Sequence, residues 1–253
     1  MSPATPIDWL LSSLLLSLRV APMFAFAPPF SLVPTPVLVR LLMGMGIAAS
    51  LAAGSAPNAL VSGLDVGGIA RIAASEILLG SVFVLALQLA FGGLYMAGRT
   101  IDVQAGYGLA MLIDPTTSAQ TPLVGTIFAY AAGAVFFGMN GHVDLLRILA
   151  ASLQAIPLGA GHLPRSLTAL TDFMSIIFIL AFGVAGGVIL CLFLADLAIA
   201  TMSRTIPQMN VLVLGFQGKT LITLAVLPVT LGVSGALLAR MMRLSLEAIQ
   251  RML

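Results

Sequence analysis

Residues 99–122 read RTIDVQAGYGLAMLIDPTTSAQTP and connect two very apolar segments of the chain. The stretch contains glycines, prolines and the carboxylates Asp102 and Asp114, yet its centre, residues 109–113, is apolar. Connections longer than about 12–15 residues are uncommon in compact proteins and usually have a function. An apolar sequence in a connection, rather than on the face of a helix, needs a special reason. We therefore predict that this stretch is the main candidate for the function of the chain.

The composition of the whole chain excludes a soluble protein. Of its 253 residues, 60% are hydrophobic and 8% are charged, and the mean hydropathy is +1.12. Soluble domains carry roughly 25% charged residues. The eleven basic and nine acidic residues are spread singly, so there is no basic run that would follow a nucleic-acid backbone. The early Asp8 and late Arg19 argue against a cleaved signal peptide. The chain is therefore predicted to be a polytopic membrane protein that binds no nucleic acid.

Six apolar segments predict an all-α fold, and they cover residues 7–30, 41–56, 69–98, 122–139, 173–195 and 220–239. The uncharged run 77–98 would be about 33 Å long as a helix, which is enough to cross a hydrocarbon core. Pro22 and Pro28-Pro29 predict that the first segment is not one straight helix. Residues 196–219 are predicted to be a second polar interruption, and residues 240–253 to be a basic amphipathic helix.

Arg19 lies inside the first apolar segment and allows two interpretations. A cation at the centre of a bilayer costs about 2.5–3.5 kcal/mol on insertion scales. The side chain therefore either lies near a helix end, where it reaches the membrane surface, or faces a polar or protein-lined interior. The sequence leaves both interpretations open.

Small residues at a spacing of four predict close contacts between helices. One such stripe is Gly44, Ala48 and Ala52, and another is Gly125, Ala129 and Gly133. Between the fourth and fifth segments, Asp144 and Arg147 are three residues apart and are predicted to pair on the surface of an amphipathic helix. Thr121 and Pro122 predict the start of the fourth helix.

The sequence contains no recognisable catalytic, metal or cofactor motif. His142 and His162 are twenty residues apart in Gly-flanked positions, and no third ligand is spaced to join them. Asp114-Pro115 is typical of a turn. A proton relay at Asp114 would need an ionisable partner, and only Asp102 and Arg99 are near in the sequence. We therefore expect no enzyme and no cofactor.

Four blocks of sequence, taken together and in order, resemble the FliR family of flagellar export-apparatus proteins. They are LRVAPMFAFAPPFS at 18–31, GYGLAMLIDPTTSAQTPLVG from Gly106, FFGMNGHVDLLRILAASLQAIPLG at 136–159, and SRTIPQMNVLVLGFQGK at 203–219. The family's Pro-Gln-Met-Asn core corresponds to Pro207, Gln208, Met209 and Asn210. The SctT proteins of virulence injectisomes are close relatives. The Val-Leu-Gly-Phe run that ends at Phe216 favours the flagellar branch.

The resemblance implies a non-enzymatic channel subunit of a type III export gate in the bacterial inner membrane, within the flagellar basal body. Such a subunit assembles with FliP-like and FliQ-like subunits into a helical channel for unfolded flagellar export substrates, with FlhB-like and FlhA-like proteins as neighbours. Residues 1–195 would be the FliP-like part, and residues 196–253 a FliQ-like hairpin with an amphipathic tail. Much of the helical mass would lie above the bilayer plane, so that six conventional spans would overstate the topology.

The resemblance also implies that residues 106–122 project into the channel as a plug. An apolar constriction can close a channel by dewetting. Gly106 and Gly108 would let the loop swing, Asp114 and Pro115 would form its turn, and the seal would come from Leu109, Met111, Leu112 and Ile113. The family often carries Phe where this chain has Leu109 and Leu112. The core at residues 207–210 is predicted to pack against partner subunits.

Two other interpretations remain at this point. The loop could be an interfacial segment that merely packs on its neighbours. The whole chain could instead be a secondary transporter for a small solute, with its site at interrupted helices. A transporter of that kind would be indicated by internal repeats and by an ionisable pair inside the membrane. No convincing repeat is present, and the longest apolar runs carry no charge.

Overall fold

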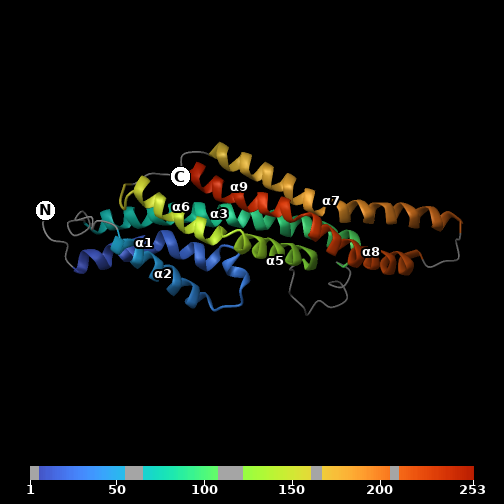
Figure 1. The fold of residues 1–253 in the computed structure, drawn as a ribbon, viewed down its shortest axis with the longest axis horizontal. Coiled ribbons are helices and arrows are strands. Elements are labelled where there is room, and N and C mark those ends of the chain that lie inside the picture. The colour runs from blue at the N-terminus through green and yellow to red at the C-terminus, as the bar shows by residue number, and fades with distance from the viewer. Residues whose placement is uncertain (1–5, 55–64, 108–121, 161–166, 206–210) are drawn as a thin grey trace. The chain divides into compact units, whose positions relative to one another are not determined.

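The computed structural model describes residues 6–54, 65–107, 122–160, 167–205 and 211–253. All regular structure in these ranges is helical, as Figure 1 shows. The elements are α1 (Pro6–Phe26), η1 (Phe30–Leu32), α2 (Val37–Gly54), α3 (Val66–Ala105), α5 (Leu123–Gly138), α6 (Gly141–Ala155), α7 (Leu167–Thr205), α8 (Val211–Val233) and α9 (Gly235–Met252). The predicted all-α, polytopic fold is confirmed.

Five helices in the described ranges, namely α1, α2, α3, α7 and α8, are long and apolar enough to cross a membrane. The pair α5 and α6 bends by 70° between Gly138 and Gly141 and would be a sixth span if counted as one. Helix α3 has 40 residues and α7 has 39. Their contour lengths of about 60 Å are twice the thickness of a hydrocarbon core, which is about 30 Å. Both helices therefore extend beyond the apolar part of a bilayer.

Several predicted boundaries were wrong. Helix α3 continues through residues 99–105, so the connection begins at Gly106 and not at Arg99. The polar interruption predicted at 196–219 is largely helical, because α7 runs to Thr205 and α8 begins at Val211. The break between α8 and α9 lies at Ser234, inside the last predicted apolar segment.

The prolines of the first segment act differently from one another. Pro22 lies inside α1 and does not end it, which corrects the predicted break there. The neighbours Ala21 and Met23 are buried, so surrounding protein supports the helix at this point. The end of α1 is instead fixed before Pro28-Pro29, where Arg40 donates to the carbonyl of Ala25 at 2.7 Å and Gln88 to that of Phe26 at 2.8 Å. These two bonds satisfy carbonyls that have no partner within the helix.

The chain forms two compact units. Unit 1 consists of Met1–Leu89, Phe136–Met174 and Met242–Leu253, and unit 2 of Ala90–Val135 and Ser175–Met241. Neither unit is a continuous stretch of sequence. The division at residue 195 rests on likeness to other chains and stays a prediction.

Unit 1 is held together by close approaches of its helices and by an aromatic cluster. Helix α2 meets α1 at Gly44, where a Cβ would come within 2.6 Å of the Cα of Ala21. Helix α3 meets α1 at Gly80, where a Cβ would lie 2.7 Å from the carbonyl oxygen of Arg19. Of the predicted stripe, Gly44 and Ala48 are buried and form the contact face, while Ala52 is half-buried. The aromatic contacts join Phe24, Phe30, Phe136, Phe137 and His142.

The glycines of α2 provide a matched pair for testing this packing. Gly44→Ala should lower the thermal stability of the purified protein, because the new methyl group would overlap the backbone of α1. Overpacking of this kind costs about 1–3 kcal/mol. Gly46→Ala should have little effect, since nothing lies within 4 Å of its added Cβ. Thermal unfolding in detergent compares the two variants, and equal melting temperatures would contradict the contact.

Candidate functional site

Most of the residues predicted to form the plug lie outside the described ranges. This holds for Gly108, Leu109, Met111, Leu112, Ile113, Asp114 and Pro115, and equally for Pro207, Gln208, Met209 and Asn210 of the predicted partner contact. Gly106 is the one plug residue that the structure describes. The structure also describes the two ends of the connection, which are the end of α3 and the start of α5. Both ends belong to unit 2.

The two ends meet at a crossing of α3 and α5 that only glycine allows. A Cβ on Gly98 would lie 2.2 Å from the Cα of Gly125, so the backbones are in contact. A Cβ on Gly125 would lie 2.9 Å from the carbonyl oxygen of Tyr95. Gly125, Ala129 and Gly133 are all buried, which confirms the predicted contact stripe of α5. The crossing places the start of α5 directly beside the last turns of α3.

Asp102 bonds the end of α3 to the first turn of α5. Its side chain is only 7% exposed, and Oδ1 accepts the N–H of Val124 at 3.1 Å. The first N–H groups of a helix have no partner within the helix, and a carboxylate there also interacts favourably with the helix dipole. Caps of this kind contribute about 0.5–2 kcal/mol. Helix α5 begins at Leu123, one residue later than predicted.

Gly106 ends α3 in a left-handed conformation, with φ +88°. The N–H of Tyr107 donates to the carbonyl of Asp102 at 2.9 Å, and the N–H of Gly106 to that of Val103 at 3.2 Å. These two bonds form a Schellman motif, whose left-handed position favours glycine. The ring of Phe216 from α8 covers this glycine, because an added Cβ would lie 2.9 Å from its Cδ2. Gly106 thus fixes where the connection leaves α3, while its hinge role stays a prediction.

The sequence pattern missed the bond between Asp102 and Val124. The two residues are separated by 22 positions and by the whole connection. The only available signal was a carboxylate near the end of a very apolar helix, since such a group needs a partner.

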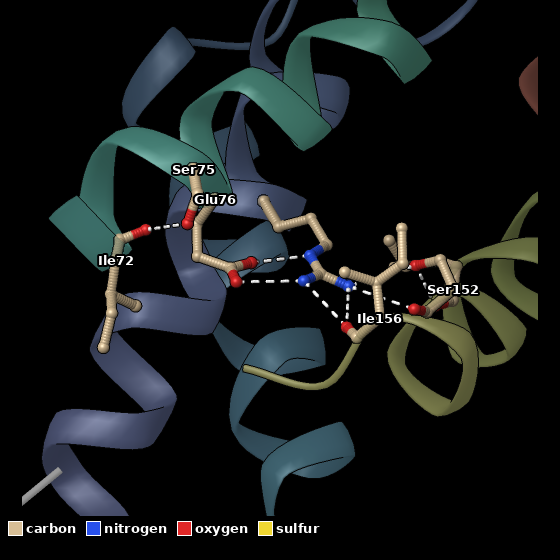
Figure 2. A network of polar contacts seen from close by, with 7 residues as sticks. Ile72, Ser75, Glu76, Ser152 and Ile156 are labelled. Carbon is tan, nitrogen blue, oxygen red and sulfur yellow. Dashed lines mark hydrogen bonds and ion pairs between the residues drawn. The ribbon is translucent and has the colours of Figure 1, made fainter. Parts of the chain in front are cut away.

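Unit 1 contains a second buried polar group, centred on Arg19. Its Nε donates to Oε2 of Glu76 at 2.6 Å, and its Nη2 donates to Oε1 at 2.9 Å. The same guanidinium donates to the carbonyl of Ile156 at 3.2 Å and, at 3.3 Å, to that of Ser152. Figure 2 shows Glu76 approaching the guanidinium from one side and the end of α6 from the other. Arg19 and Glu76 are 0% and 1% exposed.

This arrangement decides between the two interpretations of Arg19. The side chain faces a protein interior and does not reach a membrane surface. Its carboxylate partner, Glu76, was missed by the sequence analysis because it lies 57 positions away. A buried, bidentate pair whose remaining donors reach carbonyls is typical of a structural ion pair.

Other polar groups in the described ranges form no cluster of three metal ligands. Asp144 and Arg147 pair at 2.9 Å on the surface of α6, as predicted. They line a cavity of about 540 Å³ between α6 and α9, together with Met139, Ile148, Ala151, Arg243, Leu246, Glu247 and Gln250. Its lining carries both signs of charge.

Large apolar side chains are exposed on α2 and α8. On α2 they include Leu38, at 67%, and Leu42, at 57%. On α8 they include Leu221, at 68%, Leu224, at 62%, and Val229, at 65%. Exposed apolar faces on helices of this kind mark contacts with lipid or with other subunits. Helix α9, in contrast, buries Met241, Ser245 and Ile249 and exposes its arginines, which confirms the predicted amphipathic tail.

Comparison with known proteins identifies the family of the chain. The sequence model of "Bacterial export proteins, family 1" matches residues 10–245. The chain is 30% identical to the flagellar biosynthetic protein FliR of Escherichia coli over 232 residues, which cover 90% of this chain and 82% of that protein. It is 31% identical to FliR of Bacillus subtilis over 194 residues, 72% of each chain.

The resemblance extends to the injectisome branch. The chain is 29% identical to the Yop proteins translocation protein T of Yersinia pestis over 199 residues, which cover 74% of this chain and 76% of that protein. The family match includes Gly98, Asp102, Gly106 and Gly125, the residues that hold the two ends of the connection. The chain therefore belongs to the FliR family of membrane-embedded bacterial export proteins.

Proposed function

We propose that this chain is the channel subunit of a flagellar type III protein export gate. In this proposal it lies in the bacterial inner membrane, within the flagellar basal body, and passes unfolded flagellar export substrates. It assembles with FliP-like and FliQ-like subunits, beside FlhB-like and FlhA-like proteins, and it has no enzymatic activity of its own. Membership of the FliR family supports the proposal, as do the five described helices that are long and apolar enough to cross a membrane.

Residues 106–122 act in this proposal as the plug of the channel. The observation that supports this role most strongly is the fixed base of the connection, where Gly98 meets Gly125 and Asp102 bonds to Val124. The two ends of the connection are therefore held side by side within unit 2. An apolar constriction excludes water and ions from a channel that is idle.

The exposed apolar faces of α2 and α8 support assembly with other subunits. The large apolar side chains on these two faces are exposed in the isolated chain, and such surfaces are usually covered by lipid or by other proteins. In the proposed complex, partner subunits and lipid cover these faces together. The same proposal includes packing of residues 207–210 against partner subunits. It also includes the likeness of residues 1–195 to FliP and of residues 196–253 to FliQ.

A transporter for a small solute is less well supported. The ionisable pair that such a transporter would need is present as Arg19 and Glu76, but both side chains are buried and bonded to each other. The guanidinium also bonds to the carbonyls of Ser152 and Ile156 at the end of α6, as expected of a structural ion pair. The FliR family consists of export proteins, which gives the transporter no support.

Affinity purification tests the proposed assembly. The chain, tagged at one terminus and expressed with the FliP-like and FliQ-like subunits of the same organism, should elute with both after detergent extraction. The same tag on an unrelated polytopic membrane protein serves as the control. Recovery of the chain as a stable monomer, without either subunit, would contradict the proposal.

A further inference from the structure

We infer that the cavity between α6 and α9 in unit 1 binds the headgroup of an anionic phospholipid, with Arg243 as the anchor of its phosphate. The volume of the cavity, about 540 Å³, lies within the range of about 300–1,000 Å³ that is usual for small-ligand sites. All of its lining residues belong to unit 1. The inference does not depend on the connection at 106–122 and goes beyond the proposed function.

The polar part of the lining comes from one face of each helix. Helix α6 contributes Asp144 and Arg147, and α9 contributes Arg243, Glu247 and Gln250. Residues three and four apart lie on the same face of a helix, so each set is turned to the same side. The opposite, apolar face of α9 is buried in the protein and is not available to lie in a bilayer. The polar face is therefore the one that α9 offers to a ligand.

The charges around the cavity do not cancel. Arg147 donates to Asp144 at 2.9 Å, and Glu247 pairs with Arg251, one turn further along α9, at 3.5 Å. Arg243 is exposed and has no ion-pair partner among the residues that the structure describes. One positive charge is thus left uncompensated beside the cavity. Guanidinium groups bind phosphate oxygens through strong, charge-assisted hydrogen bonds, so an anion with a phosphate group fits this position.

Apolar side chains complete the lining and distinguish a lipid from a free phosphate. They include Met139, Ile148 and Leu246, of which Ile148 and Leu246 are only 7% and 6% exposed. A free phosphate has no group to place against such side chains, whereas the glycerol and first acyl carbons of a phospholipid do. Basic pockets between the helices of membrane proteins bind anionic lipid headgroups in this way.

The two carboxylates narrow the class of headgroup. A carboxylate offers about four acceptor positions, so Asp144 and Glu247 can accept further hydrogen bonds beside their arginines. A headgroup with one negative phosphodiester and free hydroxyl donors matches both the single uncompensated cation and these acceptors. Phosphatidylglycerol has both features. Phosphatidylcholine has neither a net negative charge nor a hydroxyl donor in its headgroup.

Binding of a fluorescent phosphatidylglycerol to the full chain tests the site. The chain is purified in detergent with any subunits that elute with it, and the affinity is measured by fluorescence polarisation. Arg243→Gln should weaken binding by about tenfold, because a hydrogen bond from a charged donor to the phosphate is lost. Arg240→Gln provides the matched control. It removes an exposed arginine from the same helix, outside the cavity lining, and should leave the affinity unchanged.

A second variant tests the cavity without removing a charge. Ala151, which is exposed and lines the cavity on α6, becomes tryptophan. Ala151→Trp should also weaken binding, because the ring occupies the space of the lipid. The melting temperature of each variant is measured in parallel, and a fall confined to the affinity supports the site.

Two competitors identify the ligand. Unlabelled phosphatidylglycerol should displace the probe, whereas phosphatidylcholine and inorganic phosphate should not. Displacement by phosphatidylcholine would show adsorption of acyl chains, and displacement by inorganic phosphate a site for free anions; either result would overturn the inference. Equal affinities of Arg243→Gln and Arg240→Gln would overturn it as well. Each of these results leaves the proposed assembly untouched, since that is tested by which subunits elute with the chain.

Discussion

Cells that carry the chain without residues 109–113 should leak small ions, while the export complex still assembles. The deleted residues are the apolar centre of the connection, which we propose as the seal. A channel wide enough for unfolded polypeptide conducts ions freely once an apolar constriction is removed. The expected change is therefore large, from a closed channel to one that dissipates the membrane potential. A potential-sensitive dye in idle cells measures it, with the amount of complex determined in parallel.

Assembly should survive the deletion because the base of the connection does not depend on its centre. The ends are held by the crossing of Gly98 with Gly125 and by the bond from Asp102 to Val124. A connection that is five residues shorter still joins two ends that lie side by side, since the cost of closing a loop changes slowly with its length.

Replacements within the connection show whether the seal depends on the apolar character of its side chains or on their shape. Leu109→Ser with Leu112→Ser should leak, whereas Leu109→Phe with Leu112→Phe should remain closed, because phenylalanine keeps the constriction apolar. An unchanged leak after the deletion would count against a plug. Loss of assembly would instead favour a loop that merely packs on its neighbours.

The apolar pattern of the sequence predicted the helical fold but not the ends of its helices. Helix α3 continues to Ala105 because Ala97, Ile101 and Ala105 are buried at a spacing of four. Between them stand Arg99, Thr100 and Gln104, which make the segment polar on average. A prediction from average hydropathy therefore ends α3 too early, because the buried positions that continue the helix recur only at every fourth residue.

The site was predicted only in part, for a different physical reason. The long, apolar-centred connection and Gly106 are visible as local patterns, because glycine and loop length act within a few residues of sequence. The partners of Asp102 and Arg19 lie 22 and 57 positions away. Which residues meet is decided by where helices cross, and local sequence patterns do not show these crossings.

Breaking the buried ion pair of unit 1 should produce the largest loss of stability of any change in a single side chain. Removal of one partner leaves an uncompensated charge in the interior, which costs about 3–5 kcal/mol. The surface pair of Asp144 and Arg147 offers a matched control, with side chains that are 43% and 75% exposed. Breaking that pair should cost less than about 1 kcal/mol. Thermal unfolding of the purified complex in detergent compares the two pairs.

The two halves of the buried pair should not be equivalent. In Arg19→Leu, the remaining Glu76 can be neutralised by taking up a proton. The carbonyl of Ile156 loses the donor that Arg19 supplies, while that of Ser152 keeps the N–H of Ile156. In Glu76→Leu, the remaining guanidinium cannot lose its charge. Glu76→Leu should therefore destabilise the protein more than Arg19→Leu does.

A double-mutant cycle completes the test. The double variant, with leucine at both positions, should be more stable than Glu76→Leu, because apolar side chains replace a buried pair at little cost. Equal effects of the buried and surface pairs, or simple additivity in the cycle, would show that Arg19 and Glu76 do not depend on each other. In that case the position of α6 against α1 and α3 would rest on apolar packing alone.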